Sequence, residues 1–588
     1  MAKQKPVYTL ANACQDCYKC LRSCAVKAIT FQNGRASILE ERCLQCGQCL
    51  AACPSRAKRI RDDLDVARDL VAKGEMVAVS LAPSWRGATG FNRARLVAAL
   101  KALGVGIVGE TALGAEQVTM AMARRLAQAR EGLHISTACP VIVDYVLKYR
   151  PEFAGRLMPV ASPALTHARL LKEHYGEEIR VVFVGPCAAK KAEADRHPDL
   201  LAVALTFGEM KRWLRDGQFD AGVQPIDEDS AFSPSRSHEG ALYSLSGGML
   251  EGLRRTGLVS QASLVAIASL DNFSAALDRL GQEPQKNAIF VEALACPGGC
   301  VMGPASSSDR SEILAVSDLL RHVQGRERVD TGAQVTVVPM VYAPIPLPAR
   351  SAHGLEAIQA MLASLGKHLP EDEKNCSGCG YPSCRDLAVA ILEGQAEARM
   401  CVSNMRRQAA HKASAMVRAM PSALVMVDQE LNILEANEAF AGMFAGGETS
   451  RFLGRLEDLE GLPVGDFIEF SGLMRKVLRT GVDIQKEHFR YKKGIYNVYV
   501  FSVEKYSLVG AIVTDVTSFR NARVPLARKV REVLDKNIAT VQEIACLLGE
   551  HMVETETILS TIVDDYDESL FGVADHDDEP ADGRGEAG

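Results

Sequence analysis

The segment CQDCYKCLRSC, residues 14–24, places four cysteines at the spacing C-x2-C-x2-C-x3-C, and CLQCGQCLAACP, residues 43–54, repeats that spacing. A proline follows the last cysteine of the second copy. This doubled run is a ligand pattern for two 4Fe–4S clusters. A zinc site rarely uses four such closely spaced cysteines twice in a row, and a disulfide framework belongs to far shorter secreted chains. We therefore predict two iron–sulfur clusters within residues 1–60.

The spacing resembles that of the bacterial two-cluster ferredoxins. In that family the last cysteine of each run ligates the cluster of the other run. The resemblance implies one 4Fe–4S cluster held by Cys14, Cys17, Cys20 and Cys53. It implies a second cluster held by Cys43, Cys46, Cys49 and Cys24.

Composition indicates a redox-active chain of several domains. The 588 residues are 47% hydrophobic and 24% charged, which is ordinary for globular domains with buried cores. Unpaired cysteines in such number belong in a reducing compartment, and the start MAKQKPVYTLANAC has no apolar signal segment. No uncharged apolar run approaches the ~20 residues needed to cross a bilayer. The net charge of −6 gives no sign of a nucleic-acid surface. We expect a cytoplasmic protein that binds neither membrane nor nucleic acid.

Residues 61–347 alternate apolar runs with amphipathic helical stretches such as ARLVAALKAL and ALTHARLLKEHY. This alternation predicts an α/β domain with parallel strands. The strand-like runs are MVAVSLAP, VGIVG, IRVVFVG, LVAIASL and AIFVEALAC.

A second group of four cysteines lies on three loops of this domain. The loops read STACP (136–140), GPCAAKK (185–191) and ACPGGC (295–300). Each loop follows an apolar run, so its cysteine stands where a strand ends, which is the usual place for a site in an open α/β sheet. The alternative is scattered structural cysteines, but three loops flanked by Pro and Gly favour one common site.

These loops resemble the H-cluster motifs of FeFe-hydrogenases, TSCCP, MPCxxKK and MACxGGCxxGG, and Ser246-Gly247-Gly248 resembles the family's SGG segment. The resemblance spans about residues 1–345. It implies that Cys300 bridges a 4Fe–4S cluster to a diiron subcluster with CO and CN ligands. It also implies that Lys190, a compact ammonium with three donors, binds a cyanide. The implied ligands of the 4Fe–4S cluster are Cys139, Cys187, Cys296 and Cys300.

The chain differs from this family at the positions that align with its proton-transfer path. Ala138 stands where the family has the cysteine that passes protons to the diiron site, and a methyl group cannot do so. Ala121 and Met122 align with a glutamate pair that continues the path. Gly185 and Leu294 replace two methionines beside the site. Because fast turnover needs a general acid or base within reach, we expect low hydrogen turnover.

A third group, spaced C-x2-C-x4-C-x16-C, occupies residues 350–410. It resembles the small 4Fe–4S domain of corrinoid-protein and electron-transfer complexes, and long helical patterns surround it. Zinc is the alternative, because four thiolates do not exclude it. The neighbouring cluster motifs favour iron–sulfur. The implied ligands are Cys376, Cys379, Cys384 and Cys401.

Residues 415–520 resemble a PAS domain. PSALVMVD leads to ILEANEAF, which matches the family's strand, turn, strand and Asn-x-Ala-Phe helix start, and Asp515-Val516-Thr517 matches its closing motif. No haem or flavin ligand is evident. Residues 521–566 then repeat apolar positions every seven residues, which predicts a coiled-coil signalling helix, and the acidic tail 567–588 is predicted to be disordered. The two rows of the seam are Leu534, Val541, Leu548, Thr555 and Ile562, and Ile538, Ala545, Met552 and Leu559.

The predicted fold class is multidomain α/β and α+β, with a ferredoxin module, an H-cluster domain, a helical 4Fe–4S domain, PAS and a coiled coil. The resemblances imply a sensory FeFe-hydrogenase-like protein that responds to hydrogen or redox state. Its expected partners are a redox protein, a separate effector such as a phosphatase or kinase, and a second copy through the coiled coil. Two alternatives stay open: a catalytic hydrogenase, and an iron–sulfur redox protein that never receives the diiron unit.

Overall fold

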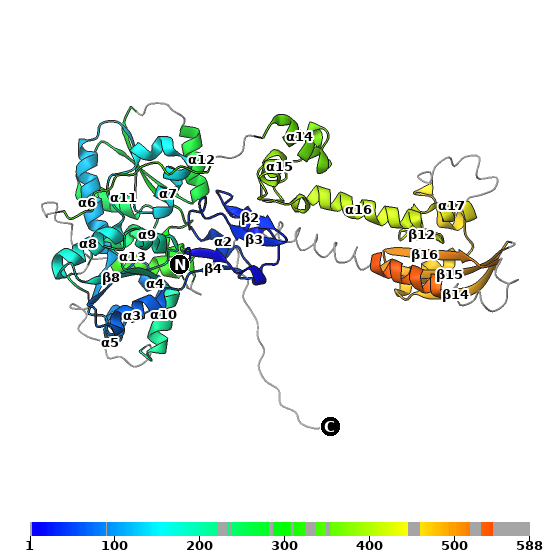
Figure 1. The fold of residues 1–588 in the computed structure, drawn as a ribbon, viewed down its shortest axis with the longest axis horizontal. Helices are drawn as coiled ribbons and strands as arrows, with labels where there is room; N and C mark the ends of the chain where they lie inside the picture. The colour runs from blue at the N-terminus through cyan, green and yellow to red at the C-terminus, as the bar shows by residue number, and fades with distance from the viewer. Residues whose placement is uncertain are drawn as a thin grey trace, which may run out of the picture. The chain divides into compact units, whose positions relative to one another are not determined.

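The computed structural model describes residues 3–89, 91–219, 232–235, 237–280, 286–306, 311–323, 335–348, 353–444, 459–492, 494–517 and 531–544. The chain divides into two compact units, Met1–Met400 and Cys401–Gly588, which are described separately (Figure 1). Within the described part of the chain, every helix is too short or too polar to span a bilayer.

The first unit begins with the predicted ferredoxin module. Strand β1 (Val7–Thr9) pairs antiparallel with β4 (Lys58–Ile60), and β2 (Ile29–Gln32) pairs with β3 (Arg35–Ile38). Each cysteine run contains one short helix, α1 (Lys19–Arg22) or α2 (Gln48–Ala51). The N-cap residue of each helix has a left-handed backbone conformation: Tyr18 at φ 59° for α1 and Gly47 at φ 81° for α2. The repeat in the sequence therefore becomes a repeat in the fold.

The α/β domain contains two parallel sheets, and all five predicted strand runs are strands. The first sheet has the order β6-β5-β8-β9, and the second has the order β10-β11-β7. The short strands β7 and β9, with sequences GLHI and VALT, are additional to those predicted. The strands are β5 (Val77–Leu81), β6 (Ile107–Glu110), β7 (Gly132–Ile135), β8 (Arg180–Gly185), β9 (Val203–Thr206), β10 (Ser263–Ala268) and β11 (Ala288–Leu294).

Among the helices that surround the two sheets, α5, α8 and α10 start at side-chain caps. Asn92 caps α5, and Ser162 caps α8, where Pro163 takes the first helical position. Thr206 and Glu209 form a capping box at the start of α10. The helices are α3 (Leu64–Ala72), α4 (Trp85–Thr89), α5 (Arg93–Ala102), α6 (Thr111–Gln128), α7 (Pro140–Tyr149), α8 (Pro163–Tyr175), α9 (Ala189–Arg196), α10 (Phe207–Asp216), α11 (Gly248–Thr256), α12 (Leu270–Leu280) and α13 (Glu312–Val323).

A buried ion network fixes the ferredoxin module to the α/β domain. The Lys191 ammonium is 1% exposed and lies 3.0 Å from Asp63 Oδ2 and 2.8 Å from Glu209 Oε1. Asp63 follows the last strand of the ferredoxin module and also pairs with Arg61 at 2.9 Å. Removing one partner of such a network would leave a buried charge unpaired, which is strongly destabilising.

His167 on α8 makes this domain sensitive to acid. Its ring is fully buried, with Nδ1 2.8 Å from Ser80 Oγ, and burial lowers its pKa to about 3. The unfolded chain would take up this proton near pH 6.5. The stability contributed by neutral His167 is therefore present above pH 6.5 and is lost as the pH falls toward 3.

We expect that His167→Gln will lose about 2 kcal/mol less unfolding free energy than the parent between pH 7 and pH 5. Below pH 6.5 the buried histidine lowers the free energy of unfolding by about 1.4 kcal/mol per pH unit, and glutamine removes this contribution. Urea unfolding followed by tryptophan fluorescence measures this loss in the α/β domain. The two tryptophans of the chain, Trp85 and Trp213, both lie in its core. Parallel pH profiles of variant and parent would contradict the assignment.

The rest of the first unit is a small helical segment, residues 353–400. It contains α14 (Leu355–Ser364) and α15 (Cys384–Leu392), which pack together through Leu362 and Ala388. Three of the four cysteines of the third group lie in this segment, and Cys401 is the first residue of the second unit.

The second unit has the PAS architecture predicted from the sequence. Helix α16 (Val402–Ala419) leads into an antiparallel sheet of order β13-β12-β16-β15-β14, with α17 (Glu438–Phe444) and α18 (Ser471–Thr480). The strands are β12 (Ala423–Val427), β13 (Ile433–Ala436), β14 (Ile484–Tyr491), β15 (Gly494–Glu504) and β16 (Leu508–Asp515).

Asn437, in the motif that identified this domain, ties three elements together. Its side chain is fully buried, and its Oδ1 accepts hydrogen bonds at 2.9 Å from the backbone N–H groups of Leu424 in β12 and Phe440 in α17. Its Nδ2 donates to Ser422 O at 2.8 Å and to two carbonyl oxygens at the C-terminal end of α16, both at 3.3 Å. This one amide therefore holds the end of α16 against the PAS core.

One residue of the predicted coiled-coil seam packs on the PAS sheet of its own chain. Residues 531–544 are helical, but Val541 is 9% exposed and packs against Phe501 and Ile512 of the PAS sheet of its own chain. A heptad pattern cannot distinguish a partner helix from a neighbouring sheet, so the prediction that Val541 belongs to a coiled-coil seam is not confirmed. The seam positions Ala545, Leu548, Met552, Thr555, Leu559 and Ile562, and the tail 567–588, lie outside the described residues.

Candidate hydrogenase-like iron–sulfur site

Thiols from the two ferredoxin runs act on each other electrostatically. Burial raises the pKa of Cys20 to about 11, and the neighbouring thiols that act on it include Cys53 from the other run. Conversely, Cys24 acts on Cys43, whose pKa burial raises to about 11, and on Cys46, whose pKa burial raises to about 12. Four sulfurs also accept backbone N–H groups at 3.2–3.5 Å, and such bonds tune cluster potentials. These sulfurs belong to Cys14, Cys24, Cys43 and Cys53.

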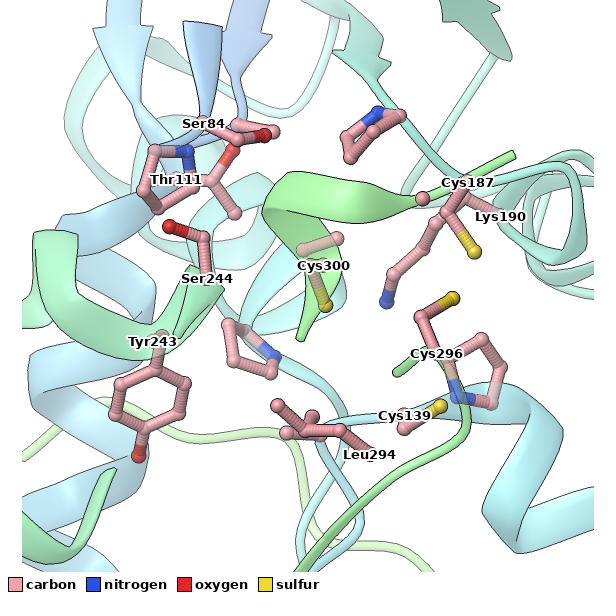
Figure 2. A pocket seen from close by; sticks show the side chains of 18 of the residues that line it. Ser84, Thr111, Cys139, Cys187, Lys190, Tyr243, Ser244, Leu294, Cys296 and Cys300 are labelled. Atoms are coloured by element: carbon pink, nitrogen blue, oxygen red, sulfur yellow. The ribbon is translucent and has the colours of Figure 1, made fainter. Parts of the chain in front are cut away.

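The three loops of the α/β domain bring the second cysteine group to one cavity. Cys139 follows β7 and precedes Pro140, the first residue of α7. Cys187 lies between β8 and α9, and Cys296 and Cys300 follow β11. The cavity has about 840 Å³ of space free of protein atoms and is lined by all four cysteines. Figure 2 shows the sulfurs and the Lys190 amine directed toward this space.

Burial controls the protonation of these four thiols. It raises the pKa of Cys187 to about 11 and also raises the pKa of Cys139, and it raises the pKa values of Cys296 and Cys300 well above the ordinary range. The thiols also raise one another's pKa values, so they would hold protons at neutral pH until a metal centre displaced them. A buried, converging set of thiols beside an ammonium fits the 4Fe–4S cluster that the family resemblance implies.

Lys190 is held in place by partners that the sequence analysis did not name. Its Nζ lies 2.6 Å from Glu193 Oε2 and donates to Ser162 Oγ at 2.8 Å, and all three residues are buried. Two of its three donors are thus used, which leaves one for a ligand in the cavity. Glu193 lies three residues after Lys190 on α9, and this i,i+3 spacing was the signal that could have identified it.

The ferredoxin module supplies part of the cavity wall. Cys46 lines the cavity and acts electrostatically on Cys296. Gly47, at φ +81°, has no room for a side chain, because a Cβ there would lie 2.7 Å from Cγ of Pro304. The second ferredoxin site therefore adjoins the four-cysteine site directly.

The positions that depart from the family pattern lie in apolar surroundings. Ala138 lines the cavity, and it packs with Ala121 and Met122 in one hydrophobic cluster. Glu116, on the same helix α6, accepts hydrogen bonds from two backbone N–H groups, and burial raises its pKa to about 7. Carbon side chains therefore occupy the positions that the sequence analysis aligned with the family's proton-carrying residues.

The two other departures also affect the cavity. Leu294 lines it, and Gly185 permits Phe183 to pack close, since a Cβ at Gly185 would lie 2.6 Å from the Phe183 ring.

The cysteines of the third group differ in exposure, and two of them lie at helix starts. Cys376 is exposed, whereas Cys379, Cys384 and Cys401 are buried. The Cys384 N–H donates to Asn375 Oδ1 at 2.8 Å, and Cys401 is the N-cap of α16. Among the residues that the structure describes, no three Cys, His, Asp or Glu side chains form a site for a single metal ion. All four of these thiols are free of disulfide bonds.

Comparison with known families agrees with this arrangement. Residues 75–304 match the C-terminal domain of the iron-only hydrogenase large subunit, and residues 13–57 match a 4Fe–4S dicluster domain. Residues 372–403, which include the whole third cysteine group, match a putative Fe–S cluster family. Residues 417–521 match the PAS fold.

Individual relatives are distant. The NADP-reducing hydrogenase subunit HndD of Solidesulfovibrio fructosivorans is 23% identical over 47% of this chain and 58% of its own length. Iron hydrogenase 1 of Clostridium pasteurianum is 26% identical over 49% of this chain and 63% of its own length. The human nuclear prelamin A recognition factor is 25% identical over 56% of this chain and 84% of its own length. The chain thus spans about three-fifths of the two hydrogenases.

An FeFe-hydrogenase from Chlamydomonas reinhardtii aligns with 48% of this chain and 100% of its own, at 16% identity and a TM-score of 0.34. Motifs, domain families and relatives together show a likeness to iron–sulfur proteins of the hydrogenase class. The chain is an FeFe-hydrogenase-like multidomain protein with a 4Fe–4S dicluster domain and a PAS domain.

Proposed function

We propose that this chain is a sensor of hydrogen, or of the redox state linked to it, and that it signals through PAS to a separate effector. The observation that carries the proposal is the position of Ala138. It lies in the wall of a cavity whose four thiols and lysine are all retained, yet it belongs to one apolar cluster with Ala121 and Met122. A site that keeps its ligands but has an alanine where the family's cysteine proton donor aligns suits detection better than rapid turnover.

The residues of the cavity would hold an H-cluster in the following way. Cys139, Cys187, Cys296 and Cys300 would bind the 4Fe–4S part, and a diiron part, when present, supplies hydrogen binding. Lys190, oriented by Glu193 and Ser162, offers its remaining N–H to a ligand. Leu294 and Ala138 exclude water, and they provide no group that holds a proton near Cys300.

The ferredoxin module would connect this site with a redox partner protein, because Cys46 stands at the cavity itself. The PAS unit would pass the state of the clusters to an effector such as a phosphatase or kinase. Dimerisation through the C-terminal helix and a cytoplasmic location belong to the same proposal.

Infrared spectra and iron content of anaerobically matured protein test the proposal. We expect CO and CN bands that change when hydrogen is added, and about eighteen iron atoms per chain, the sum of four cubanes and one diiron unit. Reconstitution without maturation enzymes should give about sixteen. Absence of the bands would favour the redox protein without a diiron unit. Rapid gas turnover would favour a catalytic hydrogenase.

A further inference from the structure

The segment of residues 353–400 is docked on the ferredoxin module through backbone contacts. Phe31 N and Thr30 Oγ1, both of β2, donate to Gln395 O at 3.0 Å. The Gln32 side chain donates to Gly394 O, also at 3.0 Å. An ion pair of 3.1 Å between Arg399 and Asp16 extends the contact to the first cysteine run. Neither cysteine spacing nor family resemblance predicted this docking.

The contact includes the loops that carry the cysteines. Gly380, at φ +90°, is so close to α1 that a Cβ would lie 3.0 Å from Leu21 Cγ. Arg22 Nη1 donates to Gly378 O at 3.4 Å. Gly378 and Gly380 flank Cys379, while Leu21 and Arg22 lie between Cys20 and Cys24. The predicted site of the second ferredoxin cluster, which includes Cys24, therefore borders the predicted site of the third cysteine group at these loops.

One cation is fixed at this boundary. The Lys27 Nζ donates to Leu21 O and Arg22 O, both at 3.2 Å, and the side chain is half-buried. Burial lowers the pKa of Lys27, while the charges of Cys24, Asp271 and Cys379 raise it and that of Arg22 lowers it. Because Leu21 and Arg22 also lie against Gly380 and Gly378, the ammonium stands where the cysteine loops of the ferredoxin module and of the third group meet.

We propose that Lys27 is a cation shared by these two sites and that it couples them for exchange of single electrons. The inference rests on the proposed function only in that both sites hold 4Fe–4S clusters. A positive charge stabilises the more negative, reduced form of a cluster, so Lys27 raises both potentials together. One cluster loses an electron and its neighbour gains it, and no bond is made or broken.

This placement makes the second ferredoxin site a junction. Through Cys46 it adjoins the hydrogenase-like cavity, and the loop that precedes Cys24, with Lys27 bound to it, adjoins the third group. This junction therefore offers electrons a route between the cavity and the third group.

The test is a redox titration of the full chain, reconstituted with iron and sulfide but without the diiron unit, using dithionite as reductant and EPR as readout. Lys27→Gln should shift two cluster potentials to more negative values. Lys27→Arg should keep both near the parent values, because it retains the charge. The matched control is Arg59→Gln, which removes an exposed positive charge from β4 of the same module and should shift neither.

A Cys379→Ala variant identifies which signal belongs to the third group, because that signal should be lost. The proposal is overturned if Lys27→Gln shifts one potential or none, if Arg59→Gln shifts the same two, or if the parent forms no cluster at the third group. The titration needs neither hydrogen nor the diiron unit. A failure of the proposed sensing function, seen as absent CO and CN bands, would therefore leave this result intact.

Discussion

Ala138→Cys should raise the hydrogen turnover of the matured protein. The new thiol would stand in the cavity wall next to Cys139, where a positioned acid can act on a bound proton. Proton transfer of this kind typically contributes about 10²–10⁴-fold. The gain should be smaller than that range, because Ala121 and Met122 still fill the outer path with carbon. Hydrogen evolution from a reduced viologen dye, normalised to the infrared bands, measures it.

Ala138→Ser is the matched control for this experiment. A serine hydroxyl is similar in size to a thiol and can form hydrogen bonds, but it does not ionise near neutral pH. A gain with cysteine alone would show that an acid–base group is what the native site lacks. Unchanged turnover in Ala138→Cys, with intact infrared bands, would mean that another step limits the rate or that Ala138 is misaligned with the family's cysteine.

Asn437→Ala should destabilise the PAS unit by about 3–5 kcal/mol. The substitution leaves the N–H groups of Leu424 and Phe440 buried without an acceptor, and each such group costs about 1–3 kcal/mol. It also frees the carbonyl oxygens at the end of α16. Hydrogen–deuterium exchange should therefore become faster in β12, in α17 and in the last turn of α16.

Asn497→Ala is a suitable comparison within the same domain. Asn497 is half-buried and accepts one hydrogen bond, from His488 N at 3.0 Å, so its loss should cost about 1 kcal/mol or less. Equal effects of the two substitutions would show that the Asn437 amide does not have the special role given to it here.

The features that sequence predicted well are those fixed by local spacing. A 4Fe–4S cluster constrains the distance along the chain between its ligands, so the doubled run of residues 14–54 was decisive. The strand MVAVSLAP became β5 and the helix ALTHARLLKEHY became α8 almost residue for residue, because each carries its own period and caps.

Features that depend on surfaces far apart in the chain were not accessible in this way. Nothing in the sequence near Gln395 indicates that its carbonyl accepts the N–H of Phe31. The heptad that contains Val541 reads equally well as a seam or as the buried face of a helix on a sheet. The pairing of Lys190 with Glu193 is partly local and partly not. Their i,i+3 spacing allows an ion pair, but the sequence does not show that both side chains are buried together.

The contact of Gly47 with Pro304 has a consequence for biosynthesis. Domains near the N-terminus generally fold first while the chain is still on the ribosome. The ferredoxin cysteines leave the ribosome early, whereas the last part of the cavity wall, from Cys296 to Gly303, is made about halfway through translation. The two ferredoxin clusters can thus be inserted into a nascent chain. Any diiron unit has to wait until the far wall of the cavity has been made.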